Sequence, residues 1–199
     1  MAYATVAQLR QLISTDKNVH DVLLAQLIAR AQVYLDEEIG FSFEAAADTT
    51  RYFDAASILR GGNVDGPRLY FGTWVCATPT TVTNGDTTVI TSTYYVKEPR
   101  NAAPYYAITL LGSSGYSWEG KSTGDTENAI TVIAKFAYST SAPVDITHAT
   151  LRLALWYYRQ RDSSTDLDRP MLAEGVTILP SQIPADVTAI LDAYKWRTQ

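Results

Sequence analysis

Apolar residues recur at the three- and four-residue spacing of a helix in two parts of the chain, near its start and near its end. In the first part, Thr5 and Gln8 form a capping-box pattern, which predicts a short helix to about Ser14. Asn18 and Asp21 repeat the pattern before a longer helix, which is predicted to end at Gly40. The predicted buried stripe of that helix comprises Leu24, Leu27, Ile28, Ala31, Tyr34 and Leu35.

From Thr49 the pattern changes to short runs rich in Val, Ile, Thr and Tyr. These residue types favour strands. Turn chemistry separates the runs, in NGD, PRNAAP and GSSG. The segment is therefore predicted to be an antiparallel β-module that ends near Ser139. Its predicted strands lie in LYFGTWV, TTVIT, STYYVKE, YYAITLL and NAITVIAKF.

Helical spacing returns after SAPVDIT. Pro143 suits a first helical turn, where its missing N–H costs nothing, and Asp145 complements the positive end of the helix dipole. The helix is predicted to continue through THATLRLALWYYRQR. Residues 162–182 are predicted to form a long loop, and Pro184 opens a final helix. The apolar face of that helix comprises Val187, Ile190, Leu191 and Tyr194.

This order of elements predicts an α+β fold with an inserted domain. Residues 1–48 and 140–199 are predicted to pack together as a helical domain, and residues 49–139 to form the inserted antiparallel β-module.

The helix from Ile146 to Arg161 carries more apolar surface than one small helical core would normally bury. Either this helix is central to its domain, or its second stripe meets another chain. Arg159 and Arg161 suit the negative end of the helix dipole and could pair with a partner's carboxylates. One stripe comprises Ile146, Ala149, Leu153 and Trp156, and the other Leu151, Leu155 and Tyr158.

Composition limits the classes of function. The chain has 199 residues, a net charge of -5 and a pI of about 5.0, which disfavours a protein that grips DNA through many phosphates. An acidic surface still suits DNA that must slide past, because like charges repel. Cys76 is the one cysteine, so no intrachain disulfide or thiolate zinc site is expected, and a buried apolar role is favoured for it. We expect no signal peptide, no membrane span and a cytoplasmic origin.

Residues 115–122, GYSWEGKS, match the phosphate-loop pattern G-x-x-x-x-G-K-[ST]. A phosphate loop needs a helix directly after it, because the helix supplies backbone amides and a dipole. Here the following residues, TGDTENAITVIA, predict a turn and a strand. Trp118 and Glu119 would also place a bulky and an anionic side chain in the cradle. A hairpin connection is therefore favoured over a nucleotide site.

The other residues that could form a catalytic or metal site are better explained by structural roles. His20 and His148 lie in first turns of helices, and no serine stands in a G-x-S-x-G elbow, so a hydrolase triad is disfavoured. Asp162, Asp166 and Asp168 lack calcium-loop spacing. The acidic run 36–38 at the end of the long helix is either an exposed face or a surface for a basic partner.

A carbohydrate-binding β-module stays open as an alternative function, because flat aromatic rings on strands can stack on sugars. Trp74, Tyr105 and Trp118 are the candidate residues. Aromatic residues also favour strands for their packing alone, which is the favoured explanation.

Taken in order, several segments resemble the head–tail connector (adaptor) proteins of tailed bacteriophages, of the gp6-like type. The resemblance spans nearly the whole chain. It departs from the family pattern at Ala137, where the family tends to have a glycine between two aromatic residues. The segments are LDEEIGFSFE, TTRYFDA, YYVKEPRNAAPYYAITL, ITVIAKFAYSTSAPVDITHATLRLALWYYRQR and LPSQIPADVTAILDAYKW.

The resemblance implies a structural virion protein without enzyme activity, cofactor or metal. Such proteins form a ring, usually of about twelve copies, beneath the portal protein at the neck of the virion. They extend the channel for double-stranded DNA, which passes without sequence-specific binding, and they dock a head-closure (stopper) or tail protein. The resemblance also implies that the protein is located in the virion neck, after assembly in the host cytoplasm.

We expect the helical domain to make most ring and portal contacts, and the β-module to decorate the periphery or contact neighbours. A closed ring needs two complementary faces on each subunit. The candidate ring or portal interface residues are Leu151, Leu155, Trp156, Tyr158, Arg159, Arg161, Tyr194 and Trp196.

Overall fold

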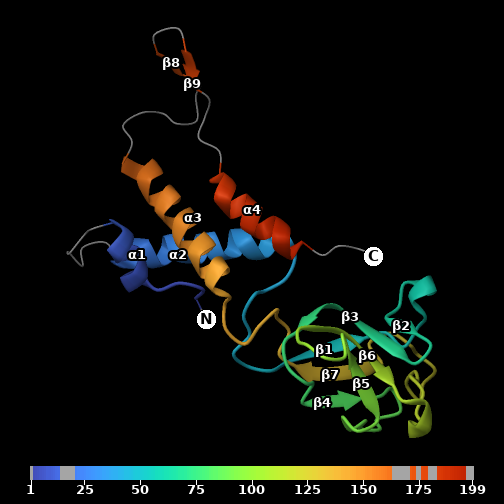
Figure 1. Cartoon of the computed structure of the whole chain (residues 1–199). Coiled ribbons are helices and arrows are strands. Elements are labelled where there is room, and N and C mark those ends of the chain that lie inside the picture. Colours follow the sequence, from blue (N-terminus) through green and yellow to red (C-terminus); the bar gives the residue numbers. More distant parts are fainter. Residues whose placement is uncertain (1, 14–20, 163–170, 174–175, 179–182, 196–199) are drawn as a thin grey trace. The chain divides into compact units, whose positions relative to one another are not determined.

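The chain consists of two compact units, each with its own core. Figure 1 shows the computed structural model, which describes residues 2–13, 21–162, 171–173, 176–178 and 183–195. One unit comprises Ala2–Gly40 with Ala142–Gln199, and the other comprises Phe41–Ser141. The first is mainly helical and the second is built from antiparallel strands. The α+β class predicted from the sequence is confirmed.

The helical unit begins and ends its first elements as the sequence predicts. The capping box is formed: the Gln8 amide donates to Thr5 Oγ1 at 3.2 Å, and the Thr5 amide donates to Gln8 Oε1 at 2.8 Å. Gly40 ends the long helix with φ +83° and donates its amide to the Asp36 carbonyl at 2.8 Å. The second predicted cap, at Asn18, lies outside the described residues. The helices are α1 (Val6–Ile13), α2 (Asp21–Ile39), α3 (Val144–Asp162) and α4 (Ala185–Tyr194).

Helix α3 is the central helix of this unit, since it packs against α1, α2 and α4. Of the stripe predicted on α2, Leu27 and Tyr34 are only half-buried and the other members are buried. Full burial of a leucine or isoleucine stabilises a fold by about 1.5–3 kcal/mol, so these faces hold the unit together. The buried face residues are Leu9, Leu24, Ile28, Ala31, Leu35, Ile146, Ala149, Leu153, Val187 and Leu191.

The segment between α3 and α4 was predicted to be a loop, and this is wrong for six of its residues. Strands β8 (Met171–Ala173) and β9 (Val176–Ile178) pair antiparallel, with Met171 opposite Ile178. Each strand has three residues, which is too short for an alternating pattern to stand out in the sequence.

The β unit contains two antiparallel sheets. One has the order β1-β7-β4 and the other has the order β2-β3-β6-β5. The strands of the first sheet are β1 (Thr49–Phe53), β4 (Thr81–Thr83) and β7 (Ile130–Ala134). Those of the second sheet are β2 (Val64–Asp65), β3 (Arg68–Val75), β5 (Tyr95–Glu98) and β6 (Tyr105–Leu110).

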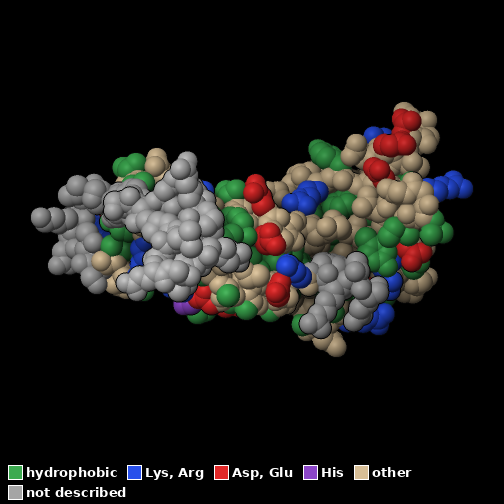
Figure 2. All heavy atoms as spheres, turned by 90° about the horizontal axis from the view of Figure 1, so that it is seen from above, with side chains coloured by type: hydrophobic (Ala, Val, Ile, Leu, Met, Phe, Trp, Pro, Cys, Tyr) green, Lys and Arg blue, Asp and Glu red, His purple; other side chains and the backbone are tan. Residues whose placement is uncertain are grey.

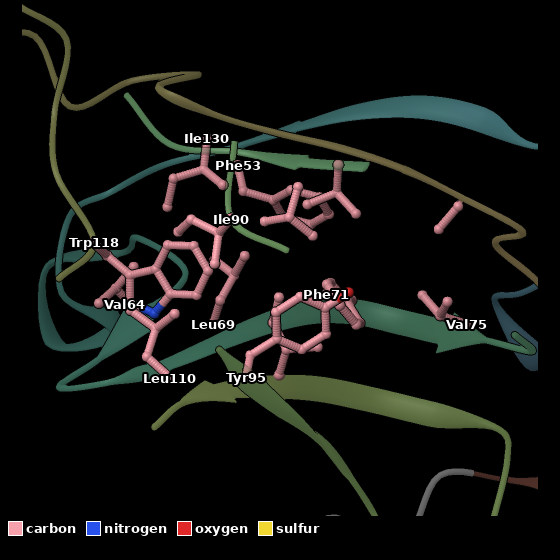
Figure 3. Close-up of a cluster of buried hydrophobic side chains, with 14 of the residues drawn as sticks. Phe53, Val64, Leu69, Phe71, Val75, Ile90, Tyr95, Leu110, Trp118 and Ile130 are labelled. Atoms are coloured by element: carbon pink, nitrogen blue, oxygen red, sulfur yellow. The ribbon is translucent and has the colours of Figure 1, made fainter. Parts of the chain in front are cut away.

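The core of the β unit lies between the two sheets. Figure 3 shows Phe53 and Ile130 of the first sheet on one side, and Leu69 and Phe71 of the second on the other. Strand β3 alternates between buried and more exposed side chains, as a strand with one face on a core must. Gly72 has φ +62° in the middle of β3, where the register with β6 shifts.

The predicted strand runs match the structure in part. Strands β3, β5, β6 and β7 lie in four of the five predicted runs, whereas β1, β2 and β4 lie outside them. The run TTVIT forms no strand. It contributes a single bridge between Val89 and Thr83 and a hydrogen bond from the Ile90 amide to the Val82 carbonyl. Its apolar residue Ile90 is nevertheless buried in the core.

Backbone hydrogen bonds join the segment by which the chain enters the β unit to the segment by which it leaves. The Tyr138 amide donates to the Ser42 carbonyl at 3.0 Å, and the Ser139 amide donates to the Phe43 carbonyl at 3.1 Å. The rings of Phe41 and Tyr138 stack at 6.2 Å, and Phe43 is fully buried beside them. We call this pairing of residues 41–45 with 138–139 the clip.

Candidate assembly interface

The candidate interface residues on α3 are largely covered within the chain itself. Leu155 is buried, and Leu151, Trp156 and Tyr158 are half-buried. The surplus apolar surface predicted on this helix is therefore small, because α3 is the central helix of its unit. Leu155 is corrected to a core residue. Arg159 is exposed at the end of the helix and is accessible to a partner.

Tyr194, the candidate interface residue on α4, makes hydrogen bonds within the helical unit. Tyr194 donates its hydroxyl to Asp145, with distances of 2.9 and 2.8 Å to the two carboxylate oxygens. Arg152 and Asp186 form a second link between α3 and α4 at 2.8 Å, and this hydrogen bond lowers the pKa of the Asp186 carboxyl. Tyr194 thus fixes α4 against α3. Trp196 and the side chain of Arg161 lie outside the described residues.

A different helix carries the exposed apolar surface. On α2, Val22 is 75% exposed and Val33 is 54% exposed, and Ala25 and Ala29 between them are also exposed. These four residues, the α2 strip, lie on the side of the helix opposite its buried face. The strip carries no charge across three turns. The helical spacing of these residues is visible in the sequence, but the stronger stripe facing the core obscures it.

Two residues of the acidic run at the end of α2 make contacts within the helical unit. Tyr3 donates its hydroxyl to Asp36, and Lys195 lies 3.8 Å from a carboxylate oxygen of Glu38. Glu37 and Glu38 are exposed. The exposed-face explanation thus fits two of the three residues. Figure 2 shows acidic, basic and hydrophobic side chains interspersed on the face that it displays, among the described residues.

The segment GYSWEGKS connects β6 to β7 and lacks the helix that a phosphate loop requires. Because β6 and β7 belong to different sheets, the predicted hairpin is wrong and the segment crosses between sheets. Trp118 is buried and donates its indole N–H to the Pro67 carbonyl at 2.8 Å. The backbone amides of Glu119 and Lys121 donate to Asn84 Oδ1 and the Asp125 carbonyl, so they are not free to bind phosphate.

The three residues considered for sugar binding do not form a flat open platform. Trp118 is in the core. The ring of Trp74 meets Tyr106 and Tyr138 edge to face, at 6.3 and 6.1 Å. The Lys97 ammonium lies 4.8 Å from the centre of the Tyr105 ring. Sugar stacking needs an exposed ring face, and Trp118 offers none.

A buried ionic network lies in the four-stranded sheet. Glu98 is buried and accepts hydrogen bonds from Thr109 at 2.7 Å, from Arg68 at 3.2 Å and from Tyr106 at 3.3 Å. Arg68 also donates to the Tyr70 hydroxyl at 3.0 Å. Burial by itself raises the pKa of Glu98, but the hydrogen bonds from Thr109 and Arg68 outweigh it, so the pKa is lowered. The network joins β3, β5 and β6.

The remaining titratable and metal-ligating residues form no metal site within the described part of the chain. No three His, Cys, Asp or Glu side chains there gather closely enough to hold a metal ion. His148 is exposed, and His20, Asp166 and Asp168 lie outside the described residues. Burial raises the pKa of the Cys76 thiol, which suits a packing role. Of the helices described, none has the length and apolar character to cross a membrane.

Comparisons with known proteins identify similar folds. No protein-family model and no curated protein matches the sequence. A chain from the neck of an empty gene transfer agent (GTA) particle, computed with C6 symmetry, is similar with a TM-score of 0.61 and 14% identity. The similarity covers 98% of this chain and 90% of that chain. A chain from the virion of the native GTA particle has a TM-score of 0.55 and 17% identity, with the same coverage. At these identities, the likeness establishes the fold.

Proposed function

We propose that this chain is a structural protein of the neck of a phage-like particle. The observation that carries the proposal is the fold likeness to a neck chain over 98% of this chain, which includes both units. The same likeness covers 90% of that neck chain, so neither unit is an unrelated addition. Independent support comes from the sequence segments that resemble head–tail connector proteins.

Within the neck, the proposed role is that of an adaptor without enzyme activity. Copies of the chain assemble into a ring beneath the portal protein, extend the DNA channel, and dock a head-closure or tail protein. The net charge of -5 supports this role, because a tightly binding channel would retard the exit of DNA. A dodecamer is the copy number that the family resemblance implies.

The α2 strip supports assembly through the helical unit. A neighbouring copy that covers the strip removes two exposed valines from water, and none of the four strip residues carries a charge. Arg159 at the end of α3 is a candidate for pairing with a partner's carboxylate. Each such contact is weak alone, so a portal that gathers the copies raises their effective concentration.

The first experiment tests assembly. The full chain is coexpressed with the portal protein of its own particle and purified through a tag on the portal. Copurification, with annular particles in negative-stain images, supports the adaptor role. A chain that never copurifies and forms no ring at any concentration contradicts it.

The second experiment locates the contact. Val22→Glu with Val33→Glu is expected to lower ring formation at least tenfold, because two charges would be buried at the contact. The control variant Val144→Glu changes another exposed valine, at the start of α3. If all three proteins assemble equally, the α2 strip is not a ring contact.

A third experiment separates the two units. Deletion of residues 50–138 behind a short linker is expected to leave portal binding intact if the helical unit makes most of the contacts. Loss of portal binding, with the helices still folded by circular dichroism, counts against this assignment.

A further inference from the structure

The turn that follows β4 begins with the dipeptide Asn84–Gly85, from the NGD sequence. In an unstructured chain, asparagine before glycine is chemically unstable. The backbone nitrogen of the glycine can attack the asparagine side chain, because glycine places no side chain of its own beside that nitrogen. In this protein both residues are buried, and Asn84 is 3% exposed. The reactive dipeptide is therefore enclosed in the β unit.

The carboxamide of Asn84 is held at both of its polar atoms. Nδ2 donates to the Ser117 carbonyl at 2.8 Å, and Oδ1 accepts from the Glu119 amide at 3.0 Å. The backbone of Asn84 is held as well. Its amide donates to the Thr88 carbonyl at 2.8 Å, and its carbonyl accepts from the Thr87 amide at 2.9 Å. Side chain and backbone are thus fixed together.

The segment that binds the carboxamide is anchored in the core. Trp118 lies between the two residues that bond to Asn84, and its side chain is buried with its indole N–H bonded to the Pro67 carbonyl. The carboxamide is therefore bonded to a part of the chain that cannot move away while the core is intact. Release of Asn84 requires a local opening of the β unit.

The fold also requires glycine at position 85. A Cβ there would lie 2.2 Å from the Glu119 carbonyl oxygen and 2.6 Å from the Gly120 carbonyl carbon. A larger residue, which would slow the attack on Asn84, would therefore collide with this backbone. The close packing of residues 117–120 against the turn explains why the β unit contains a dipeptide that is unstable in an open chain.

We propose that Asn84–Gly85 is a deamidation site that the closed β unit protects and that reacts when the unit opens. In the open chain, the Gly85 nitrogen loses its proton to hydroxide and forms a bond to Asn84 Cγ. The bond between Cγ and Nδ2 breaks, Nδ2 takes a proton from water and leaves as ammonia, and a succinimide ring remains. Water then opens the ring at either carbonyl, which leaves aspartate or isoaspartate at position 84. This inference is independent of the proposed function.

The products cannot rebuild the turn. A carboxylate at position 84 has no N–H for the Ser117 carbonyl, and it would place a negative oxygen against that carbonyl in a buried site. Isoaspartate also adds a carbon atom to the main chain, next to the close approach of Gly85 to Glu119. Each opening therefore exposes the chain to an irreversible change.

The first experiment compares the reaction in the folded and the unfolded full chain. Both samples are kept at the same mildly alkaline pH and temperature, one in buffer and one in guanidinium chloride. The peptide that contains residue 84 is followed by chromatography and mass spectrometry. The folded chain is expected to react at least about tenfold more slowly, because only its open fraction reacts. A smaller difference, or an unfolded chain that forms no product, overturns the proposal.

The second experiment tests whether opening is the route. The reaction is measured at guanidinium concentrations below the unfolding midpoint, with sodium chloride at matched ionic strength as the control. The rate is expected to rise with guanidinium, because denaturant increases the open fraction. A rate that stays constant across the series means that the closed β unit itself reacts, and it overturns the proposed protection.

Two variants test the chemistry and its consequence. Gly85→Ala, measured only in the unfolded state, is expected to react about tenfold more slowly, and an equal rate would exclude attack by this nitrogen. Asn84→Asp reproduces one product and is expected to lower the thermal midpoint of the β unit by about 5 °C or more. Asn101→Asp makes the same change at an exposed asparagine of the unit and serves as the control. Equal midpoints for Asn84→Asp and Asn101→Asp overturn the inference that the product cannot rebuild the turn.

Discussion

Replacement of Glu98 by alanine is expected to destabilise the β unit by about 2 kcal/mol at pH 7. The carboxylate accepts from Thr109, Arg68 and Tyr106, and its loss leaves these donors without their shared acceptor. Breaking a buried ion pair costs about 3–5 kcal/mol when the remaining charge stays buried. The Arg68 side chain is 37% exposed, so water can solvate the guanidinium after the substitution. The expected loss is therefore the smaller value of about 2 kcal/mol.

The pH dependence of this effect has a definite sign. The pKa of Glu98 in the folded chain lies below its ordinary value of 4.5. Because the pKa is lower in the folded chain, the stabilisation by Glu98 is fully present at pH values above the ordinary pKa. It is lost as the pH falls through the folded-state pKa. The difference in unfolding free energy between the unmodified chain and Glu98→Ala should therefore be constant near neutrality and shrink below about pH 4.5.

Hydrogen exchange in increasing denaturant provides the assay, because peptides from β3 and β6 report on the β unit separately from the helical unit. Glu127→Ala removes an exposed carboxylate of the same unit and serves as the control. An effect of Glu98→Ala below about 0.5 kcal/mol, the size of an ordinary surface change, would refute the role assigned to the network. So would a difference that stays the same from pH 7 to pH 3.

Three further predictions concern the scaffold. Gly62→Ala is expected to destabilise the β unit by several kcal/mol, since the new methyl group would meet the Ala56 carbonyl; Gly112→Ala, with open space around it, should change the denaturation midpoint little. Trp118→Phe removes the bond to Pro67 and should cost about 1 kcal/mol in denaturant unfolding, with an unchanged fold by circular dichroism. Thr5→Ala removes the cap of α1 and should cost the helical unit about 1 kcal/mol, seen as faster exchange of the α1 amides; unchanged exchange would contradict it.

The fold class was predictable because its signals are local. Thr5 with Gln8 determines where α1 begins, and Gly40 determines where α2 ends, from a few neighbouring residues in each case. The strands that were missed are short or lack alternation. Strand β1 exposes four of its five residues, so the sequence TTRYF contains no apolar face to detect.

The candidate interface was less predictable because burial is not a local property. Leu155 stands on a second apolar stripe of α3, and only the packing of α3 among the other helices shows that it is covered. Val22 and Val33 look unremarkable in a sequence, yet they remain exposed once Leu24 and Ile28 turn inward. Similarly, Leu59 is exposed on a turn that is held by hydrogen bonds, which the Ser57 hydroxyl and the Asn63 side-chain oxygen accept from the Leu59 and Asp54 amides, and no spacing rule encodes these bonds.

The clip has a consequence for how such a gene can change. Because Ser42 and Phe43 are bonded to Tyr138 and Ser139, the two ends of the β unit are adjacent. Recombination that adds, removes or exchanges the intervening segment would leave the ends of α2 and α3 to be rejoined over a short gap. The segment between the paired ends can therefore be exchanged as one piece, provided that the replacement keeps its two ends adjacent.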